Sequence, residues 1–200
     1  MDEKRIGVFI DQYLPFHPDR LYHESDNQLA PYTYYSSLCN FFEIVEKNMR
    51  TRIIIAAHPK SDYDSKPDYF CGRDIIKGNT ANLIKESSFV IAHASTSINF
   101  ALLYFKPLIF ITTDGIQKHN TGKNIMGLYI SAVAASLDKT PINIDRITTF
   151  DWDKETQYNE EAYIRYINLY IKKLGSPDKP MWDIFYSYIN GDEYRSGSHK

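Results

Sequence analysis

The sequence predicts an α/β domain built on a parallel β-sheet with helices on both faces. Short, continuously apolar segments alternate along the chain with longer segments in which apolar residues recur every three or four positions. Continuously apolar strands are typical of parallel sheets that are buried on both faces, and their alternation with amphipathic helices is typical of repeated strand–helix–strand units. We therefore expect right-handed crossovers, with ligands bound outside the carboxyl ends of the strands.

The apolar segments predict the strands of this Rossmann-like sheet. We expect strands at Ile6–Ile10, Arg52–Ala57, Asp74–Ile76, Phe89–Ala92, Leu108–Ile111 and Ile142–Ile144. The loop Gln12–Pro31 contains three prolines and should be irregular. Long loops at the carboxyl end of a strand are often functional.

The amphipathic segments predict the helices. We expect helices at Tyr32–Asn48, Ala81–Glu86 with Thr80 as its cap, Ser97–Tyr104, Asn124–Leu137 and Glu160–Leu174. The aromatic segment Met181–Ile189 is expected to dock as a further helix, and the polar stretch 191–200 to be a tail.

Composition indicates a folded domain that does not bind nucleic acid. Hydrophobic residues make up 43% and charged residues 24% of the 200 residues, which is close to the globular average. The formal net charge is −2, so no basic surface is expected to neutralise a nucleic-acid backbone. The apolar run from Phe100 to Ile111 is interrupted by Lys106 and Pro107 and is too short to cross a membrane.

The chain contains two cysteines, Cys39 and Cys71. Two are too few for the disulfide framework of a small secreted protein, and their spacing is wrong for a zinc site. We therefore expect a reducing, cytoplasmic location and no metal site.

The first candidate site is His58-Pro59-Lys60-Ser61, directly after the second strand. Proline restricts its own φ and the residue before it, so His58 should be held extended and aimed into the ligand crevice. The imidazole could donate a proton or a hydrogen bond to phosphate or ribose oxygens. The alternative is a loop histidine with a structural role.

The second candidate is the hydroxyl-bearing run Ser95-Thr96-Ser97, which joins the fourth strand to the next helix. Backbone N–H groups at the start of a helix and neighbouring hydroxyls can cradle a phosphate. Ordinary helix capping, which needs one of the three hydroxyls, explains the same pattern.

Three further residues are candidates of a weaker kind. Arg73 could pair with a phosphate, with Thr80 near it, or it could lie on a solvated face. Asp11 ends the first strand and could act as a base or a ribose ligand, or it could cap the loop. The sequence contains no dinucleotide-binding glycine motif, P-loop, nucleophile elbow or zinc-binding helix.

Three segments together carry a resemblance to a known family: Phe9–Pro15, Ile55–Ser61 and Phe89–Ser97, followed by Ala101 and Lys106-Pro107. They resemble the carboxyl-terminal half of GT-B-type glycosyltransferases over roughly residues 5–115. The resemblance is closest to the surface-carbohydrate group that includes bacterial sialyltransferases, polysialyltransferases and glycerophosphate polymerases.

This resemblance implies a role for residues 1–175 as a nucleotide-sugar-binding domain, with 176–200 as an aromatic segment and tail. In that group the histidine of the His-Pro pair and the paired hydroxyls bind a CMP- or CDP-activated donor. By matching motifs these roles fall on His58 with Pro59 and on Ser95, Thr96 and Ser97. The sugar is transferred to a saccharide acceptor of capsule or lipopolysaccharide, and the nucleotide sugar is a substrate, so no cofactor is expected.

The resemblance also implies partners. GT-B enzymes have two such domains, and the general base usually comes from the amino-terminal one, so we expect this chain to need an acceptor domain. A cytoplasmic position at the inner face of the membrane is compatible with such a role. Two other functions remain open: a nucleotide-binding module without transferase activity, and an isomerase related to the nucleotide-sugar 2-epimerases.

Overall fold

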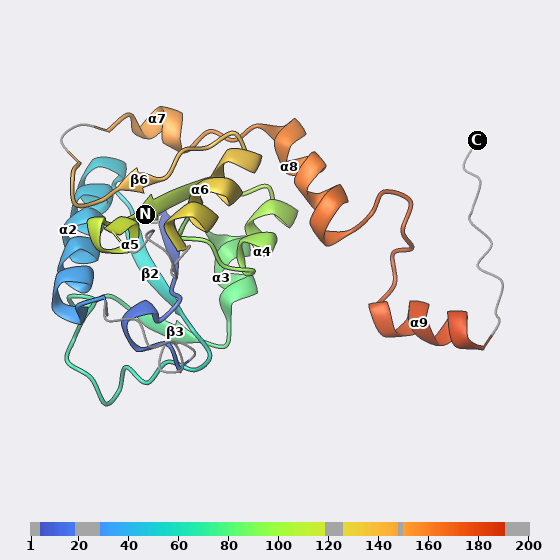
Figure 1. The fold of residues 1–200 in the computed structure, drawn as a ribbon, viewed down its shortest axis with the longest axis horizontal. Helices are drawn as coiled ribbons and strands as arrows, with labels where there is room; N and C mark the ends of the chain where they lie inside the picture. Colours follow the sequence, from blue (N-terminus) through green and yellow to red (C-terminus); the bar gives the residue numbers. More distant parts are fainter. Residues whose placement is uncertain (1–4, 19–28, 119–125, 148–149, 191–200) are drawn as a thin grey trace.

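A computed structural model of the protein describes residues 5–18, 29–118, 126–147 and 150–190. Within these residues, six strands form one sheet in the order β3-β2-β1-β4-β5-β6, and every neighbouring pair is parallel. Figure 1 shows strands of this sheet with helices around them. The strands are β1 (Ile6–Ile10), β2 (Arg52–Ala57), β3 (Ile75–Lys77), β4 (Phe89–Ala92), β5 (Leu108–Thr112) and β6 (Ile142–Asn143). The predicted Rossmann-like α/β fold is confirmed.

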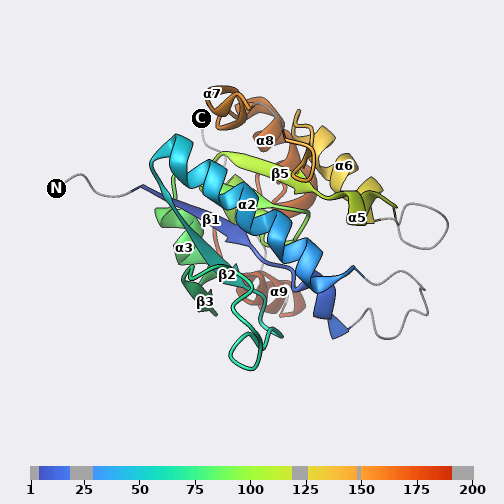
Figure 2. The same ribbon diagram turned by 90° about the vertical axis from the view of Figure 1, so that its left-hand side faces the viewer.

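Helices cover both faces of this sheet. The helices of the described residues are the 3-10 helix η1 (Leu14–Phe16), α2 (Pro31–Met49), α3 (Thr80–Glu86), α4 (Ile98–Leu103), α5 (Asp114–Lys118), α6 (Met126–Ser136), α7 (Trp152–Glu155), α8 (Glu160–Tyr166), the π-helix η2 (Ile167–Ile171) and α9 (Met181–Ile189), which lies away from the sheet (Figure 1). The long helix α2 runs across one face (Figure 2), and α3 and α4 pack against each other on the other. Right-handed crossovers explain this arrangement, because the chain leaves β1 toward one edge and leaves β3 toward the other.

The core on the α2 face is aromatic and tightly packed around β1. The ring of Phe9 lies 5.2 Å from that of Phe42 on α2 and 6.4 Å from that of Phe70 in the β2–β3 connection. All three are fully buried or nearly so. A Cβ atom at Gly7 would overlap the ring of Phe89 and the side chain of Ile53. Glycine is therefore required there by the close approach of these neighbouring side chains.

The strand order reverses between β1 and β4. From β1 the chain runs outward to β2 and β3, and it then returns to place β4 on the other side of β1. Because all strands are parallel, the loops that follow β1, β2 and β4 emerge at the same edge of the sheet. In open α/β sheets the crevice at such a reversal is where ligands bind.

Most predicted elements are confirmed, but several of them begin or end at a different residue than predicted. The third strand lies one residue later than predicted, and α3 begins at Thr80, with Asn79 rather than Thr80 in the cap position. The α4 helix is shorter than predicted at each end. The helix predicted for Glu160–Leu174 ends its α-helical part at Tyr166 and continues as a single π-helical stretch. The predicted start of α6 at Asn124 lies outside the described residues.

The aromatic segment Met181–Ile189 forms a helix, but the prediction that it docks was wrong. None of the residues of α9 is buried, and Figure 1 shows the helix standing apart from the sheet and its covering helices. No helix in the described part of the chain is long and apolar enough to cross a membrane.

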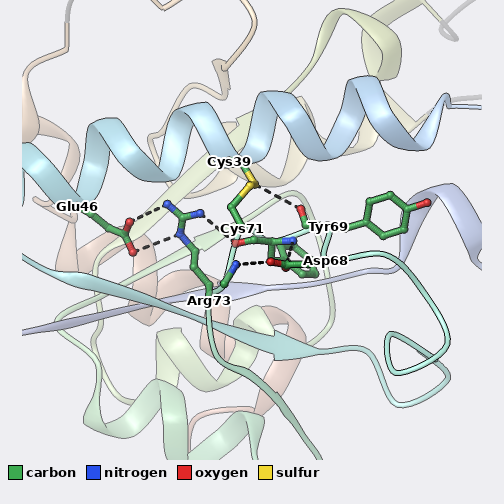
Figure 3. Close-up of a disulfide and its surroundings, with 8 residues drawn as sticks. Cys39, Glu46, Asp68, Tyr69, Cys71 and Arg73 are labelled. Carbon is green, nitrogen blue, oxygen red and sulfur yellow. Dashed lines mark hydrogen bonds and ion pairs between the residues drawn. A yellow bond between two sulfur atoms is a disulfide. The ribbon is translucent and has the colours of Figure 1, made fainter.

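The cysteine pair also departs from the prediction. Cys39 on α2 and Cys71 in the β2–β3 connection form a disulfide, with their Cα atoms 6.4 Å apart (Figure 3). The two residues are 32 positions apart in the sequence. Spacing alone could not reveal this pair, because the aromatic packing of the connection against α2 brings the two together.

Candidate functional site

A cavity of about 400 Å³ lies at the carboxyl edge of the sheet, where β1 and β4 are neighbours. It is lined from three loops and one helix. The lining residues are Gln12, Leu14 and His17 after β1, His58 after β2, Ala94, Ser95 and Thr96 after β4, and Met126 and Tyr129 on α6. The structure thus brings His58 and two of the three predicted hydroxyls into one cavity at the reversal of strand order.

The side-chain amide of Gln12 ties together two of these loops. Its Nε2 donates a hydrogen bond to the carbonyl of Ala94 at 2.8 Å, and its Oε1 accepts one from the Ala94 N–H at 3.3 Å. A two-point contact to backbone fixes both distance and orientation. The loop after β1 and the Ser95 loop are therefore held in register across the sheet.

His58 is positioned by a turn that its own sequence dictates. The N–H of Ser61 donates to the carbonyl of His58 at 2.9 Å, which closes a β-turn with Pro59 at its second position. Within this turn the N–H of Lys60 donates to Nδ1 of His58 at 3.2 Å. The neutral imidazole therefore carries its proton on Nε2. From the other side, Lys77 donates to the Ser61 carbonyl at 2.6 Å and holds the turn against β3.

Asp11 lies beneath the cavity and does not line it. It is 2% exposed. Its Oδ1 accepts from the N–H of Tyr13 at 2.9 Å, and its Oδ2 accepts from the Tyr63 hydroxyl at 2.8 Å and, more weakly, from the N–H of His58 at 3.4 Å. This carboxyl group joins the loops after β1 and β2. The geometry fits a group that positions His58 and does not reach a ligand in the cavity.

Burial governs the protonation of this carboxyl group. Burial raises the pKa of Asp11 to about 6, against the smaller opposing effect of the hydrogen bonds that it accepts from Tyr13 and Tyr63. Burial, followed by the negative charge on Asp11, also raises the pKa of Tyr63 and of Tyr35, whose hydroxyls lie 3.0 Å apart. Both phenols therefore stay protonated and available as hydrogen-bond donors at neutral pH.

The loop after β4 presents hydroxyl groups to the cavity. The N–H of Ser97 donates to Oγ of Ser95 at 3.2 Å, and the N–H of Asn99 donates to the Thr96 carbonyl at 3.1 Å. Ser95 is partly exposed and Thr96 exposed. Ser97 is the cap residue of α4, but its side chain makes no capping bond and does not line the cavity.

A buried histidine supports this loop from below. His93 is fully buried, and its Nδ1 lies 2.8 Å from the carbonyl of Ile111 while its Nε2 lies 2.9 Å from the hydroxyl of Tyr34. A carbonyl can only accept, so Nδ1 carries the proton and Nε2 accepts from Tyr34. Burial lowers the pKa of His93 to about 4. This histidine is a neutral structural group that links β4 to β5 and α2.

The structure does not bring Arg73 to the cavity. Its guanidinium donates to Glu46 on α2, at 2.7 Å and 3.3 Å, and to the carbonyl of Phe70 at 3.0 Å (Figure 3). The Arg73 side chain is only 8% exposed. It holds the β2–β3 connection against α2, beside the disulfide. Thr80 follows β3 at the edge of the sheet and, like the exposed Pro59, is absent from the cavity lining.

Six lining residues were not among the predicted site residues: Gln12, Leu14, His17, Ala94, Met126 and Tyr129. Gln12 and His17 lie in the loop that its prolines marked as irregular. A polar residue two positions after a buried strand, as Gln12 is after β1, was the available signal. Met126 and Tyr129 could not have been found, because nothing in the amphipathic pattern of α6 shows which part of its surface meets the sheet edge.

No known protein-family model matches the sequence, and no curated protein matches it. Among solved structures, a crystal structure of the glycotransferase of kitacinnamycin matches 86% of this chain with a TM-score of 0.38 and 7% sequence identity. The chain spans 37% of the length of that protein. The comparison gives a distant structural similarity to a glycosyltransferase, and a similarity at this level assigns neither a family nor an activity to this chain.

Proposed function

We propose that this chain is the donor-binding domain of a glycosyltransferase and that it binds a nucleotide-activated sugar in the cavity between the loops after β1, β2 and β4. One observation carries the proposal. An imidazole from His58 and the hydroxyl-bearing residues Ser95 and Thr96 line the same cavity, at the point where the strand order reverses. Nucleotides bind at this position in α/β sheets of this topology.

The chemistry of the lining suits a phosphate flanked by flatter, less polar groups. Nε2 of His58 and the hydroxyls of Ser95 and Thr96 are hydrogen-bond donors for phosphate oxygens. Leu14, Met126 and Tyr129 provide apolar contact for a base or a sugar face. By the resemblance to the sialyltransferase group, the base is cytosine and the acceptor is a saccharide of the bacterial surface.

In the reaction that we propose, an acceptor hydroxyl attacks the anomeric carbon, the bond from that carbon to the donor phosphate breaks, and the electron pair leaves with the nucleotide. Charge then develops on the phosphate oxygen. Donors already aimed at that oxygen lower the barrier, and this is the role of His58. Asp11 contributes by holding the His58 backbone, so it is a positioning residue rather than a base.

One observation favours a second candidate, a nucleotide-binding module without transferase activity. Among the described residues, no Asp or Glu side chain lines the cavity, so the proton of an acceptor hydroxyl has no carboxylate to go to there. A separate acceptor domain that carries the base reconciles this observation with transfer. Without such a domain, the module binds its nucleotide and does not turn it over.

A thermal-shift screen with CMP, CDP, UDP, GDP and ADP tests the proposal. A ligand at about 100 times its dissociation constant stabilises the folded state by about 2.7 kcal/mol. We expect the largest shift with a cytidine nucleotide and its loss in His58→Ala. Ser65→Ala, an exposed hydroxyl in the same connection, is the matched control and should respond like the wild type.

The outcomes separate the candidate functions. Flat responses to all five nucleotides contradict the proposal. Binding without transfer, even when an acceptor domain is supplied, supports the module. Conversion of a UDP-sugar without any acceptor identifies an epimerase.

A further inference from the structure

Two imidazoles face each other across one side of the cavity. The ring centroids of His17 and His58 are 4.9 Å apart, with an angle of 68° between the planes. His17 follows η1 and His58 follows β2, so the pair joins two loops that are 41 positions apart in the sequence. Both residues line the cavity.

The rest of the described lining carries no formal charge. It consists of one amide, two hydroxyl-bearing residues, the aromatic Tyr129 and three aliphatic or small side chains, which are Leu14, Ala94 and Met126. No Lys or Arg side chain is among them. A nucleotide diphosphate brings negative charge into this space, and charge-assisted hydrogen bonds are the strong ones for such a group. Within the described lining, the imidazoles are the groups that can become positive.

We infer that His17 and His58 form a two-imidazole anion site in which binding of a phosphate group is coupled to uptake of a proton by the pair. This inference rests on the proposed function and adds a second anion-binding residue to it. A positive charge on one of two imidazoles this close hinders protonation of the other. A bound anion offsets that repulsion.

This coupling sets the direction of the pH dependence. An imidazole gains a proton, and with it a positive charge, as the pH falls through the range around neutrality. An anion binds the protonated pair better, and affinity therefore rises as the pH falls from 8 toward 6. By linkage, each proton taken up changes the binding constant by up to tenfold per pH unit.

Other titratable or charged groups surround the pair. Within the described part of the chain they include Asp11 beneath His58, Tyr63 hydrogen-bonded to Asp11, Tyr129 in the cavity lining, Lys60 in the His58 turn and Lys66, whose Nζ lies 4.9 Å from the ring centre of Phe16. Asp11 matters most. Its pKa is raised to about 6 by burial, so it gains negative charge over the same range and also weakens anion binding at higher pH. The variant Asp11→Asn separates the two contributions.

The experiment is isothermal titration of the whole chain with CDP-glucose at pH 6.5 and 8.0, in buffers of different ionisation enthalpy. The phosphates of this probe are diesters and do not titrate in this range, so any proton taken up belongs to the protein. We expect net proton uptake and about tenfold tighter binding at pH 6.5. His17→Gln should lose most of the uptake and bind at least fivefold more weakly at pH 6.5, with little change at pH 8.0.

Two controls give the result its meaning. Thr96→Val removes a lining hydroxyl without removing a titratable group, so it should weaken binding at both pH values and leave proton uptake unchanged. Asp11→Asn should keep most of the uptake. Titration of the histidine Cε1–H signals in the wild type, with and without CDP-glucose, requires no variant and should show both imidazoles titrating at higher pH when the ligand is bound.

Each outcome decides a different point. Equal affinity at the two pH values with no proton uptake overturns the two-imidazole site and leaves the proposed function standing. Loss of uptake in Asp11→Asn but not in His17→Gln also overturns it, because the proton then belongs to the carboxyl group. Absence of CDP-glucose binding at both pH values overturns the two-imidazole site, whereas the proposed function itself is overturned by flat responses to all five nucleotides in the thermal-shift screen.

Discussion

The side chain of Gln12 holds the backbone of Ala94 by two hydrogen bonds, of 2.8 Å from Nε2 and 3.3 Å to Oε1. These contacts join residues 82 positions apart. They also fix the relation between the loop that carries His17 and the loop that carries Ser95, on either side of the strand-order reversal. Both loops line the cavity, so its shape depends on this contact.

Gln12→Ala should therefore damage binding as well as stability. Loss of two partly buried hydrogen bonds costs about 1–3 kcal/mol of unfolding free energy. We also expect roughly tenfold weaker nucleotide binding, equivalent to about 1.4 kcal/mol, measured by titration calorimetry on the folded variant. Gln117→Ala, whose amide oxygen makes one long contact outside the cavity, is the control. Wild-type affinity in Gln12→Ala would show that the loops keep their register without it.

Asp11 and His93 should have opposite effects on stability between pH 4 and 6. The pKa of Asp11 is raised to about 6, so its stabilising contribution is complete below the unfolded pKa near 3.8 and is lost as the pH rises through 6. The pKa of His93 is lowered to about 4, so its contribution is complete above the unfolded pKa near 6.5 and is lost as the pH falls toward 4. In the wild type the two nearly cancel within this window.

Single substitutions should expose each effect. Urea unfolding at half-unit steps from pH 4 to 6 should show Asp11→Asn gaining stability with rising pH, relative to the wild type, by about 1.4 kcal/mol per pH unit. His93→Asn should change by a similar amount in the opposite direction. Parallel curves for the wild type and both variants would contradict the buried, shifted state of these two groups.

Sequence reasoning identified the sheet because burial on both faces leaves continuous apolar runs, as in Ile53–Ala57 and Phe89–Ala92, that few other structures produce. It also placed His58 and Ser95 at the correct edge, since parallel strands present their carboxyl ends together. It misplaced Arg73 and the two cysteines because their partners, Glu46 and each other, depend on how the β2–β3 connection packs on α2. Such tertiary contacts leave no local pattern. The prediction that α9 docks was wrong for a related reason, because an apolar segment does not indicate which surface it will contact.

Arg73 should matter for stability and not for ligand binding. Its guanidinium is 8% exposed and paired with Glu46, whose Oε1 also accepts from the N–H of Ile53 at 2.9 Å. Removing one partner of a buried ion pair typically costs about 3–5 kcal/mol. We expect a loss toward the lower end of that range in Arg73→Ala, because the Glu46 side chain is 25% exposed.

The same variant should leave the nucleotide affinity of the folded protein within twofold of the wild type. Chemical denaturation and titration calorimetry on one preparation give both values. A large loss of nucleotide affinity at unchanged stability would contradict this structural role and would indicate that Arg73 binds phosphate.

Gly7→Ala should destabilise the fold by overpacking. The added Cβ would overlap the ring of Phe89 and Ile53, both fully buried. Overpacking in a rigid core costs about 1–3 kcal/mol. The double variant Gly7→Ala/Phe89→Leu should lose less than the sum of the single losses, because the smaller side chain makes room. Strict additivity in equilibrium unfolding would place the two positions out of contact.

The most direct test is a crystal structure of the protein with CDP bound. The account predicts a phosphate oxygen within about 3 Å of His58 Nε2, with a second oxygen at hydrogen-bond distance from the hydroxyl of Ser95 or Thr96. CDP bound at any other place on the molecule, with this cavity holding only solvent at a saturating concentration, would contradict it.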